Sequence, residues 1–178
     1  MKTGVVDFTE PAGKAVESVS LVYNIRYKHP TDKRLFIDEH PVDCIAETGG
    51  VRFLDDTDSA HPDHTYFALA QEDTPVIWIL WNNNPNIALE KFAFDSLPQL
   101  KHIIVGGKAY VKTAVSAGDI VPVHPVKSLK EAVNLAYRLA RGKHMRVVLS
   151  PAGKLTYYFQ SRKQLKRKYI EYILKCRK

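Results

Sequence analysis

Gly50-Val-Arg-Phe-Leu-Asp-Asp-Thr-Asp-Ser-Ala-His61 is the stretch of sequence that decides the fold. In it a short apolar segment runs directly into a polar loop, and Val147-Val-Leu-Ser-Pro-Ala152 repeats that arrangement about a hundred residues later. Polar loops that follow buried strands are the usual place of ligand-binding groups in α/β proteins. The two stretches therefore predict an α/β domain with its site at the carboxyl edge of the sheet.

Strands and helices alternate outward from these two stretches. Residues 42–47 and 51–55 are separated by Thr48-Gly-Gly50 and predict a hairpin. Ser128-Leu-Lys-Glu131 is a capping box that predicts the start of a helix, which Gly142 would end. Further strands are expected over 75–81, 102–105, 119–123 and 146–149, and further helices over 62–71, 87–94 and 108–117 and from about 157 onward.

This alternation predicts the architecture of the domain. Strands that alternate with helices are typical of βαβ units and of a mostly parallel sheet. We expect a three-layer Rossmann-like α/β domain with about six mostly parallel strands and helices on both faces. The domain is expected over 40–178, ending in a basic amphipathic helix. Residues 1–39 are expected to form an N-terminal extension that adds an edge strand or a helix.

The composition is that of a globular domain in a reducing compartment. Of the 178 residues, 45% are hydrophobic and 25% are charged. No apolar run approaches the roughly 20 residues that cross a bilayer, and the N-terminal segment lacks the apolar core of a signal peptide. Cys44 and Cys176 lie far apart and outside any CxxC spacing, which favours a cytoplasmic location.

The positive charge of the chain is concentrated in its last residues. From Lys154 to Lys178 there are nine Lys and Arg and one acid, Glu171, so this segment carries a charge of +8. Because the net charge of the whole chain is +7, the remaining residues sum to about −1. These cations flank an apolar stripe at helical spacing. Such a helix could bind nucleic acid or an anionic surface, or it could dock its stripe on the sheet and turn its cations to water. We favour docking, because a sheet strand directly precedes this helix.

Matches on both sides of the hairpin point to a known family. His40 precedes the hairpin, and Asp56 and Thr57 follow it where that family has Asp and Ser. Later, Ser150-Pro-Ala152 and Phe159 match parts of a second signature, Ser-Pro-Ala-x-x-Ser-x-Asp-x-Phe. Over about 40–170 the chain resembles the C-terminal domain of the Mur ligases. Within that family it is most similar to the type that adds D-glutamate to UDP-N-acetylmuramoyl-alanine.

Other positions of the family pattern are replaced in this chain. Pro41 stands where the family has Arg, and Asp58 stands where it has Lys, so two cations that would face phosphate or carboxylate are absent. The sequence contains neither a P-loop motif nor GxGxxG. The resemblance therefore implies a pseudoenzyme that is not catalytic alone and has no cofactor of its own. ATP and Mg²⁺ would bind only if a partner supplied an ATP-binding domain.

A small polar or anionic ligand is expected at the ends of the strands, with no catalytic residue and no metal ion. Asp56, Thr57 and His61 follow one strand, and Asn82 and Asn83 follow another, where their amides would hold a polar group or form a plain turn. The resemblance adds the remaining positions. The candidate ligand-binding residues are His40, Asp56, Thr57, His61, Asn82, Asn83, Ser150 and Phe159.

Three further patterns have a functional and a structural interpretation, and we favour the structural one in each case. Gly106-Gly107 could admit a phosphate to a helix N-terminus or form a tight turn. Trp78 and Trp81 are expected on one face of their strand, as an aromatic platform or as core packing. Carboxylates and imidazoles that could collect a divalent ion, or serve as turn and cap residues, are Asp55, Asp56, Asp58, His61, Asp63 and His64.

Three hypotheses on function follow. The first is a stand-alone Mur ligase C-terminal-like domain, related to the synthesis of peptidoglycan precursors, that binds a small polar or anionic ligand or a partner protein. The second is a module that binds nucleic acid or an anionic surface through the basic C-terminal helix. The third is one module of a split, ATP-dependent, amide-forming ligase whose partner chain supplies the phosphate loop.

Overall fold

The computed structural model describes residues 4–7, 34–37, 42–89, 92–154, 159 and 161–176. The chain divides into two compact units, 1–41 and 42–178. In the first unit, β1 (Gly4–Asp7) pairs with β2 (Arg34–Ile37) in antiparallel orientation. Whether 1–39 add an edge strand or a helix to the domain stays a prediction.

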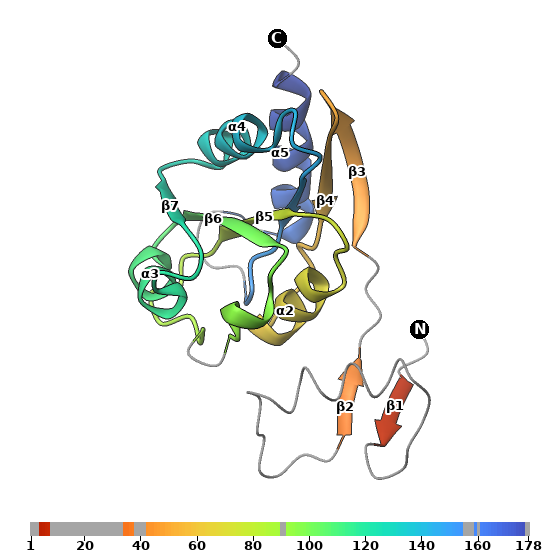
Figure 1. Cartoon of the computed structure of the whole chain (residues 1–178), viewed down its shortest axis with the longest axis vertical. Coiled ribbons are helices and arrows are strands. Elements are labelled where there is room, and N and C mark those ends of the chain that lie inside the picture. The colour runs from red at the N-terminus through yellow and green to blue at the C-terminus, as the bar shows by residue number, and fades with distance from the viewer. Residues whose placement is uncertain are drawn as a thin grey trace. The chain divides into compact units, whose positions relative to one another are not determined.

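The second unit is built on a six-stranded sheet with the order β3-β4-β8-β5-β6-β7 (Figure 1). β3 pairs with β4 in antiparallel orientation, as the predicted hairpin, and the pairs β4–β8, β8–β5, β5–β6 and β6–β7 are parallel. The predicted α/β class with a mostly parallel sheet is confirmed. The strands are β3 (Asp43–Thr48), β4 (Val51–Asp55), β5 (Val76–Trp81), β6 (Leu100–Gly106), β7 (Val123–Val126) and β8 (Arg146–Leu149).

Helices lie on both faces of this sheet, because parallel neighbours must be joined by crossover connections. α4 and α5 cover one face and α2 and α3 the other (Figure 1). Each face therefore has its own apolar layer, which gives the predicted three layers. The helices are α2 (Pro62–Ala70), α3 (Tyr110–Ala117), α4 (Leu129–Ala140) and α5 (Arg162–Lys175), together with the 3₁₀ turn η1 (Phe94–Ser96).

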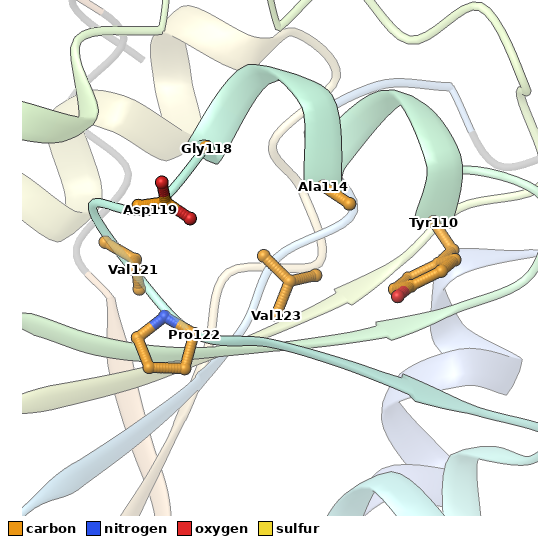
Figure 2. A pocket seen from close by; sticks show the side chains of 7 residues that line it. All are labelled: Tyr110, Ala114, Gly118, Asp119, Val121, Pro122 and Val123. Carbon is orange, nitrogen blue, oxygen red and sulfur yellow. The ribbon is translucent and has the colours of Figure 1, made fainter.

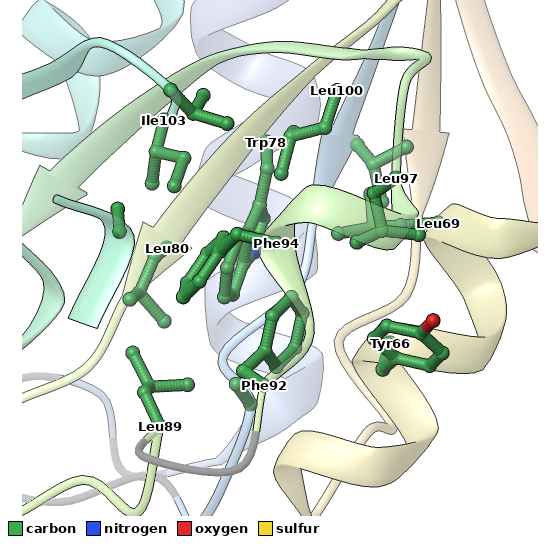
Figure 3. Close-up of a cluster of buried hydrophobic side chains, with 14 of the residues drawn as sticks. Tyr66, Leu69, Trp78, Leu80, Leu89, Phe92, Phe94, Leu97, Leu100 and Ile103 are labelled. Carbon is green, nitrogen blue, oxygen red and sulfur yellow. The ribbon is translucent and has the colours of Figure 1, made fainter. Parts of the chain in front are cut away.

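β5 lies at the centre of both layers, and its six residues are all buried. Because successive side chains of a strand point to opposite faces, Trp78 belongs to the layer under α2, and Trp81 to the layer under α4 and α5. The expectation that both Trp share one face is therefore wrong, since their separation of three positions is odd. Figure 3 shows Trp78 among the side chains of its layer, next to Phe92 and Phe94.

The helix expected over 87–94 is absent from the described part of that segment. Ile87–Leu89 and Phe92–Phe94 form tight turns instead, in which the Leu89 N–H donates to the Ile87 carbonyl at 3.0 Å and the Phe94 N–H to the Phe92 carbonyl at 2.9 Å. A helix would spread consecutive residues around its axis at about 100° each. The turns instead bury both Phe92 and Phe94 under β5, with ring centroids 4.7 Å apart. The packing of Phe92 and Phe94 under β5 therefore determines the conformation of the described part of this segment.

Two other boundaries differ from the sequence-based expectation. β7 begins at Val123, not at 119, because Gly118, at φ 55°, and the turn after it carry the chain to the edge of the sheet. α5 begins at Arg162, not at about 157, since Ser161 is its N-cap and accepts a hydrogen bond from the Gln164 N–H at 3.2 Å. The capping box of α4 is confirmed, with the Glu131 N–H donating to Ser128 Oγ at 3.1 Å.

Candidate functional site

Four parallel strands end side by side at the carboxyl edge of the sheet. In spatial order they are β4, β8, β5 and β6, and polar loops follow each of them. Backbone bonds join the loops just past the last residues, from Asp56 N–H to the Leu149 carbonyl at 3.0 Å and from Ser150 N–H to the Ile79 carbonyl at 3.1 Å. The predicted residues Asp56, Ser150 and Asn82 are thus brought to one edge, as α/β topology requires.

Asp56 and Thr57 are almost entirely buried, at 5% and 3% exposure. An Asp56 carboxylate oxygen, Oδ2, accepts a hydrogen bond from Ser59 Oγ at 2.6 Å, and the Thr57 N–H donates to Asp55 Oδ1 at 3.3 Å. These bonds fix the loop after β4 from within. The Asp56 side chain therefore stabilises its own loop.

Ser150 is fully buried and makes bonds to two other elements. Its hydroxyl shares a hydrogen bond with Thr65 Oγ1 of α2, and its carbonyl accepts from Trp78 Nε1 at 2.9 Å. The Ser-Pro-Ala segment thus ties β8 to α2 and to the core. The structure gives Ser150 a positioning role.

Asn82 and Asn83 continue β5 into the same edge, and they behave differently. Asn82 is 3% exposed and uses its amide within the chain, donating to the Pro151 carbonyl at 2.7 Å and accepting from the Asn84 N–H at 2.8 Å. Asn83 Oδ1 is buried but accepts no hydrogen bond within the described part of the chain. Buried polar atoms normally have a partner. Asn83 is therefore the predicted residue whose side-chain oxygen has no hydrogen-bond partner among the described residues.

Gly107 completes this edge beside Asn83. Its φ of +86° is in the left-handed region, and a Cβ there would lie 2.4 Å from the Asn82 carbonyl oxygen and 2.8 Å from Asn83 Oδ1. The turn after β6 therefore needs glycine in order to approach the Asn loop so closely. The Gly106-Gly107 pair makes the tight turn that the structural interpretation expects.

The remaining predicted residues are His61, Phe159 and His40. His61 is the N-cap of α2 and is exposed, with Nδ1 3.5 Å from the Asp63 N–H. Phe159 packs edge-on against Trp81, with ring centroids 6.3 Å apart. His40 lies outside the described residues.

Two cations of α5, which were not among the predicted site residues, reach the last residue of β4 and the loop after it. Lys166 Nζ lies 2.7 Å from Asp55 Oδ2, and Arg162 Nη1 donates to the carbonyl oxygen of Asp58 at 2.5 Å and to its Oδ1 at 3.2 Å. The hydrogen bond to Asp55 raises the pKa of Lys166 above its usual value. In this chain Asp58 occupies the position where the family pattern has Lys. The Arg162 side chain thus brings a cation to this loop. The signal available in the sequence was the basic first turn of the last helix.

Replacing Lys166 by Met is expected to lower the free energy of unfolding by about 1–2 kcal/mol. Asp55 is only 6% exposed in its side chain, so the change leaves a buried carboxylate without its cation, while the 39% exposure of Lys166 limits the loss. Urea denaturation measures this loss. Lys163→Met, at an exposed position of the same helix, is the matched control and should change stability by less than about 0.5 kcal/mol. Equal losses in the two variants would contradict the role of the Asp55–Lys166 pair.

A cavity of about 330 Å³ lies away from this edge, between α3 and the segment that leads into β7 (Figure 2). It is lined by Tyr110, Ala114, Gly118, Asp119, Val121, Pro122 and Val123. None of these is a predicted site residue.

Within the described ranges, no three side chains of His, Cys, Asp and Glu come together as a metal-binding group. Nor is any helix of the described part long and apolar enough to cross a membrane.

Comparison with known proteins gives sequence relatives among the UDP-N-acetylmuramoylalanine–D-glutamate ligases. The chain is 28% identical over 121 residues to the UDP-N-acetylmuramoylalanine–D-glutamate ligase of Clostridium tetani, covering 64% of this chain and 26% of that enzyme. It is 31% identical over 121 residues to the same ligase of Clostridium beijerinckii, with the same coverage of 64% and 26%. The chain thus spans about a quarter of the length of these relatives. No protein family profile matches the chain.

The fold is also that of a Mur ligase domain. A murein peptide ligase from Psychrobacter arcticus superposes with a TM-score of 0.50 at 12% sequence identity, over 74% of this chain and 29% of that protein. At this identity the match bears on the fold alone. Together with the sequence relatives it confirms that this chain resembles the C-terminal domain of the Mur ligases.

Proposed function

We propose that this domain acts in the synthesis of peptidoglycan precursors by binding a small polar or anionic ligand, without forming an amide bond alone. The ligand would bind at the carboxyl edge of the sheet, beside Asn83 and Gly107. The named substrates of the relatives, D-glutamate and UDP-N-acetylmuramoyl-alanine, define the ligand class. Because these relatives use a nucleotide-linked precursor, we place the domain in the cytoplasm.

The observation that carries this proposal is the side chain of Asn83. Its Oδ1 is buried at the carboxyl edge without a hydrogen bond from the described residues. Because the oxygen and nitrogen of an amide are distinguished only through their hydrogen bonds, Asn83 can present either an acceptor or a donor to a ligand. The neighbouring Gly107 lacks a side chain that would cover this position. A hydroxyl, amide or carboxylate group of the ligand would form a hydrogen bond with this amide.

We infer that the domain does not form an amide bond alone, because its other polar side chains form hydrogen bonds within the chain. The side chains of Asp56, Ser150 and Asn82 bond to Ser59, Thr65 and the Pro151 carbonyl of the chain itself. Amide formation at the expense of ATP needs a phosphate-binding loop with a cation, and the sequence has no P-loop motif. Side chains that stabilise loops in this way can position a ligand, but they do not activate it.

A thermal-shift screen of the whole chain with D-glutamate, UDP-N-acetylmuramoyl-alanine and ATP plus Mg²⁺ tests the proposal. A ligand at a hundred times its dissociation constant adds about 2.7 kcal/mol, which raises the melting temperature of a domain of this size by about 5–10 °C. We expect this shift with D-glutamate or the UDP-linked precursor and not with ATP plus Mg²⁺. Asn83→Ala should abolish the shift, whereas Asn86→Ala, at an exposed position of the same loop, should retain it. No shift with either precursor would contradict the proposal.

One module of a split ligase is a second candidate, favoured by the length of the relatives. The matched segment makes up about a quarter of those enzymes, so their remaining parts would have to come from elsewhere. In this case an ATP-binding partner would bring ATP and Mg²⁺. Co-purification of the chain with a P-loop protein, and amide formation by the pair only, would support this candidate.

The basic C-terminal helix α5 packs its apolar stripe against the sheet. Its apolar stripe, Leu165, Tyr169 and Ile173, is buried under the sheet, as the docking interpretation predicts. Cations of the described helix that lie in ion pairs are Arg162, Lys166, Lys168 and Lys175. Binding to nucleic acid would need cations free to displace counterions from phosphates. We therefore rank that function below the other two.

A further inference from the structure

Two histidines contact each other on the α4 side of the sheet, apart from the carboxyl-edge residues. His102 is in β6 and His124 is in the neighbouring edge strand β7. His124 Nε2 lies 3.2 Å from His102 Nδ1, and the ring centroids are 5.3 Å apart at an interplanar angle of 52°. No part of the proposed function uses this pair.

The strand register places both imidazoles on the same face of the sheet. His102 lies opposite Ile77 of β5, and His124 lies opposite Ile104 of β6. Ile77 and Ile104 both belong to the apolar layer under α4 and α5. Partners in a parallel register share a face, so both histidines lie on the face that α4 and α5 cover, where each is half-buried.

The distance between the two nitrogens suits two ligands of one metal ion. Imidazole nitrogens bind Zn²⁺ at about 2.0–2.1 Å, so two adjacent ligands at tetrahedral or right angles lie about 3–3.4 Å apart. Small rotations of the rings would turn both lone pairs toward a common point. Burial, His124 and Lys143 lower the pKa of His102 below its usual value.

We propose that His102 and His124 form a two-histidine site for a borderline divalent metal ion, Zn²⁺, Ni²⁺ or Cu²⁺. Imidazole is the ligand that these ions share, and water would complete the coordination at the half-exposed position. Bound there, the ion would join the edge strand β7 to β6. The positive charge of Lys143 opposes the ion and sets a limit to its affinity.

Calorimetric titration of the full chain, without any affinity tag, with ZnCl₂ and NiCl₂ tests this site. We expect one ion per chain, and we expect His124→Ala and His102→Gln each to weaken binding at least about tenfold, since loss of an outer-shell partner alone costs about 10–100-fold. Lys143→Gln should change binding in the opposite direction and tighten it. An electron paramagnetic resonance spectrum with Cu²⁺ should show coupling to two imidazole nitrogens, independently of any change in stability.

The control is the other histidine pair of the domain. His61 and His64 have ring centroids 6.3 Å apart, and His61→Asn retains an N-cap residue for α2. This variant should bind the ion as tightly as the unaltered chain. The proposal is overturned if the chain binds none of the three ions, if His61→Asn removes the binding, or if His124→Ala leaves it unchanged.

Discussion

Replacing Gly107 by alanine is expected to lower the free energy of unfolding by about 3 kcal/mol or more. The added Cβ would lie 2.4 Å from the Asn82 carbonyl oxygen, which is part of the backbone and cannot rotate away. The φ of +86° adds the strain of a left-handed residue, about 1–2 kcal/mol, to an overpacking cost of about 1–3 kcal/mol. Urea denaturation followed by circular dichroism measures the change.

Gly142→Ala separates the strain from the steric contact. Gly142 has a similar φ of +74°, but a Cβ there would meet no atom within 4 Å. We expect this control to lose only the strain, about 1–2 kcal/mol. If Gly107→Ala cost no more than Gly142→Ala, the close approach of the turn to the Asn loop would be wrong.

Trp78→Ala is expected to destabilise the domain by about 3–5 kcal/mol. Trp78 is completely buried in the central strand and stacks on Phe92, with ring centroids 5.2 Å apart and an interplanar angle of 15°. Its Nε1 also donates to the Ser150 carbonyl at 2.9 Å. The change would therefore open a cavity in the layer that Figure 3 shows and leave that carbonyl without its partner.

Trp78→Phe tests how this loss divides between packing and hydrogen bonding. Phenylalanine keeps an aromatic ring against Phe92 but cannot donate to the Ser150 carbonyl. An unpaired buried carbonyl costs about 1–3 kcal/mol, so Trp78→Phe should lose clearly less than Trp78→Ala. A loss in Trp78→Phe as large as that in Trp78→Ala would show that packing of Trp78 contributes little.

The fold could be predicted from local signals wherever those signals agree with the packing. The apolar run of β5 and the capping box of α4 each determine their element from a few neighbouring residues. The segment from Ile87 to Phe94 could not be predicted in this way, since its apolar spacing suits a short helix. Its conformation depends on contacts of Phe92 with Tyr66 and Trp78, which come from α2 and β5.

The candidate site could be located from the sequence but not described. Topology alone brings the ends of β4, β8 and β5 to one edge, so the prediction of Asp56, Ser150 and Asn82 at that edge needed no side-chain geometry. Which of their atoms the chain uses itself depends on distant partners. The Arg162–Asp58 contact joins residues 104 positions apart, and no local pattern indicates such a pair.

The most direct test of ligand binding at the carboxyl edge is amide chemical-shift mapping. The ¹⁵N-labelled chain would be titrated with D-glutamate and, separately, with UDP-N-acetylmuramoyl-alanine. The account predicts saturable shifts for the backbone amides of Thr57, Asn83 and Gly107 with at least one of these ligands. It also predicts unchanged amides in the far strand β7. Unchanged amides at the carboxyl edge at saturating ligand, or shifts confined to other parts of the domain, would contradict it.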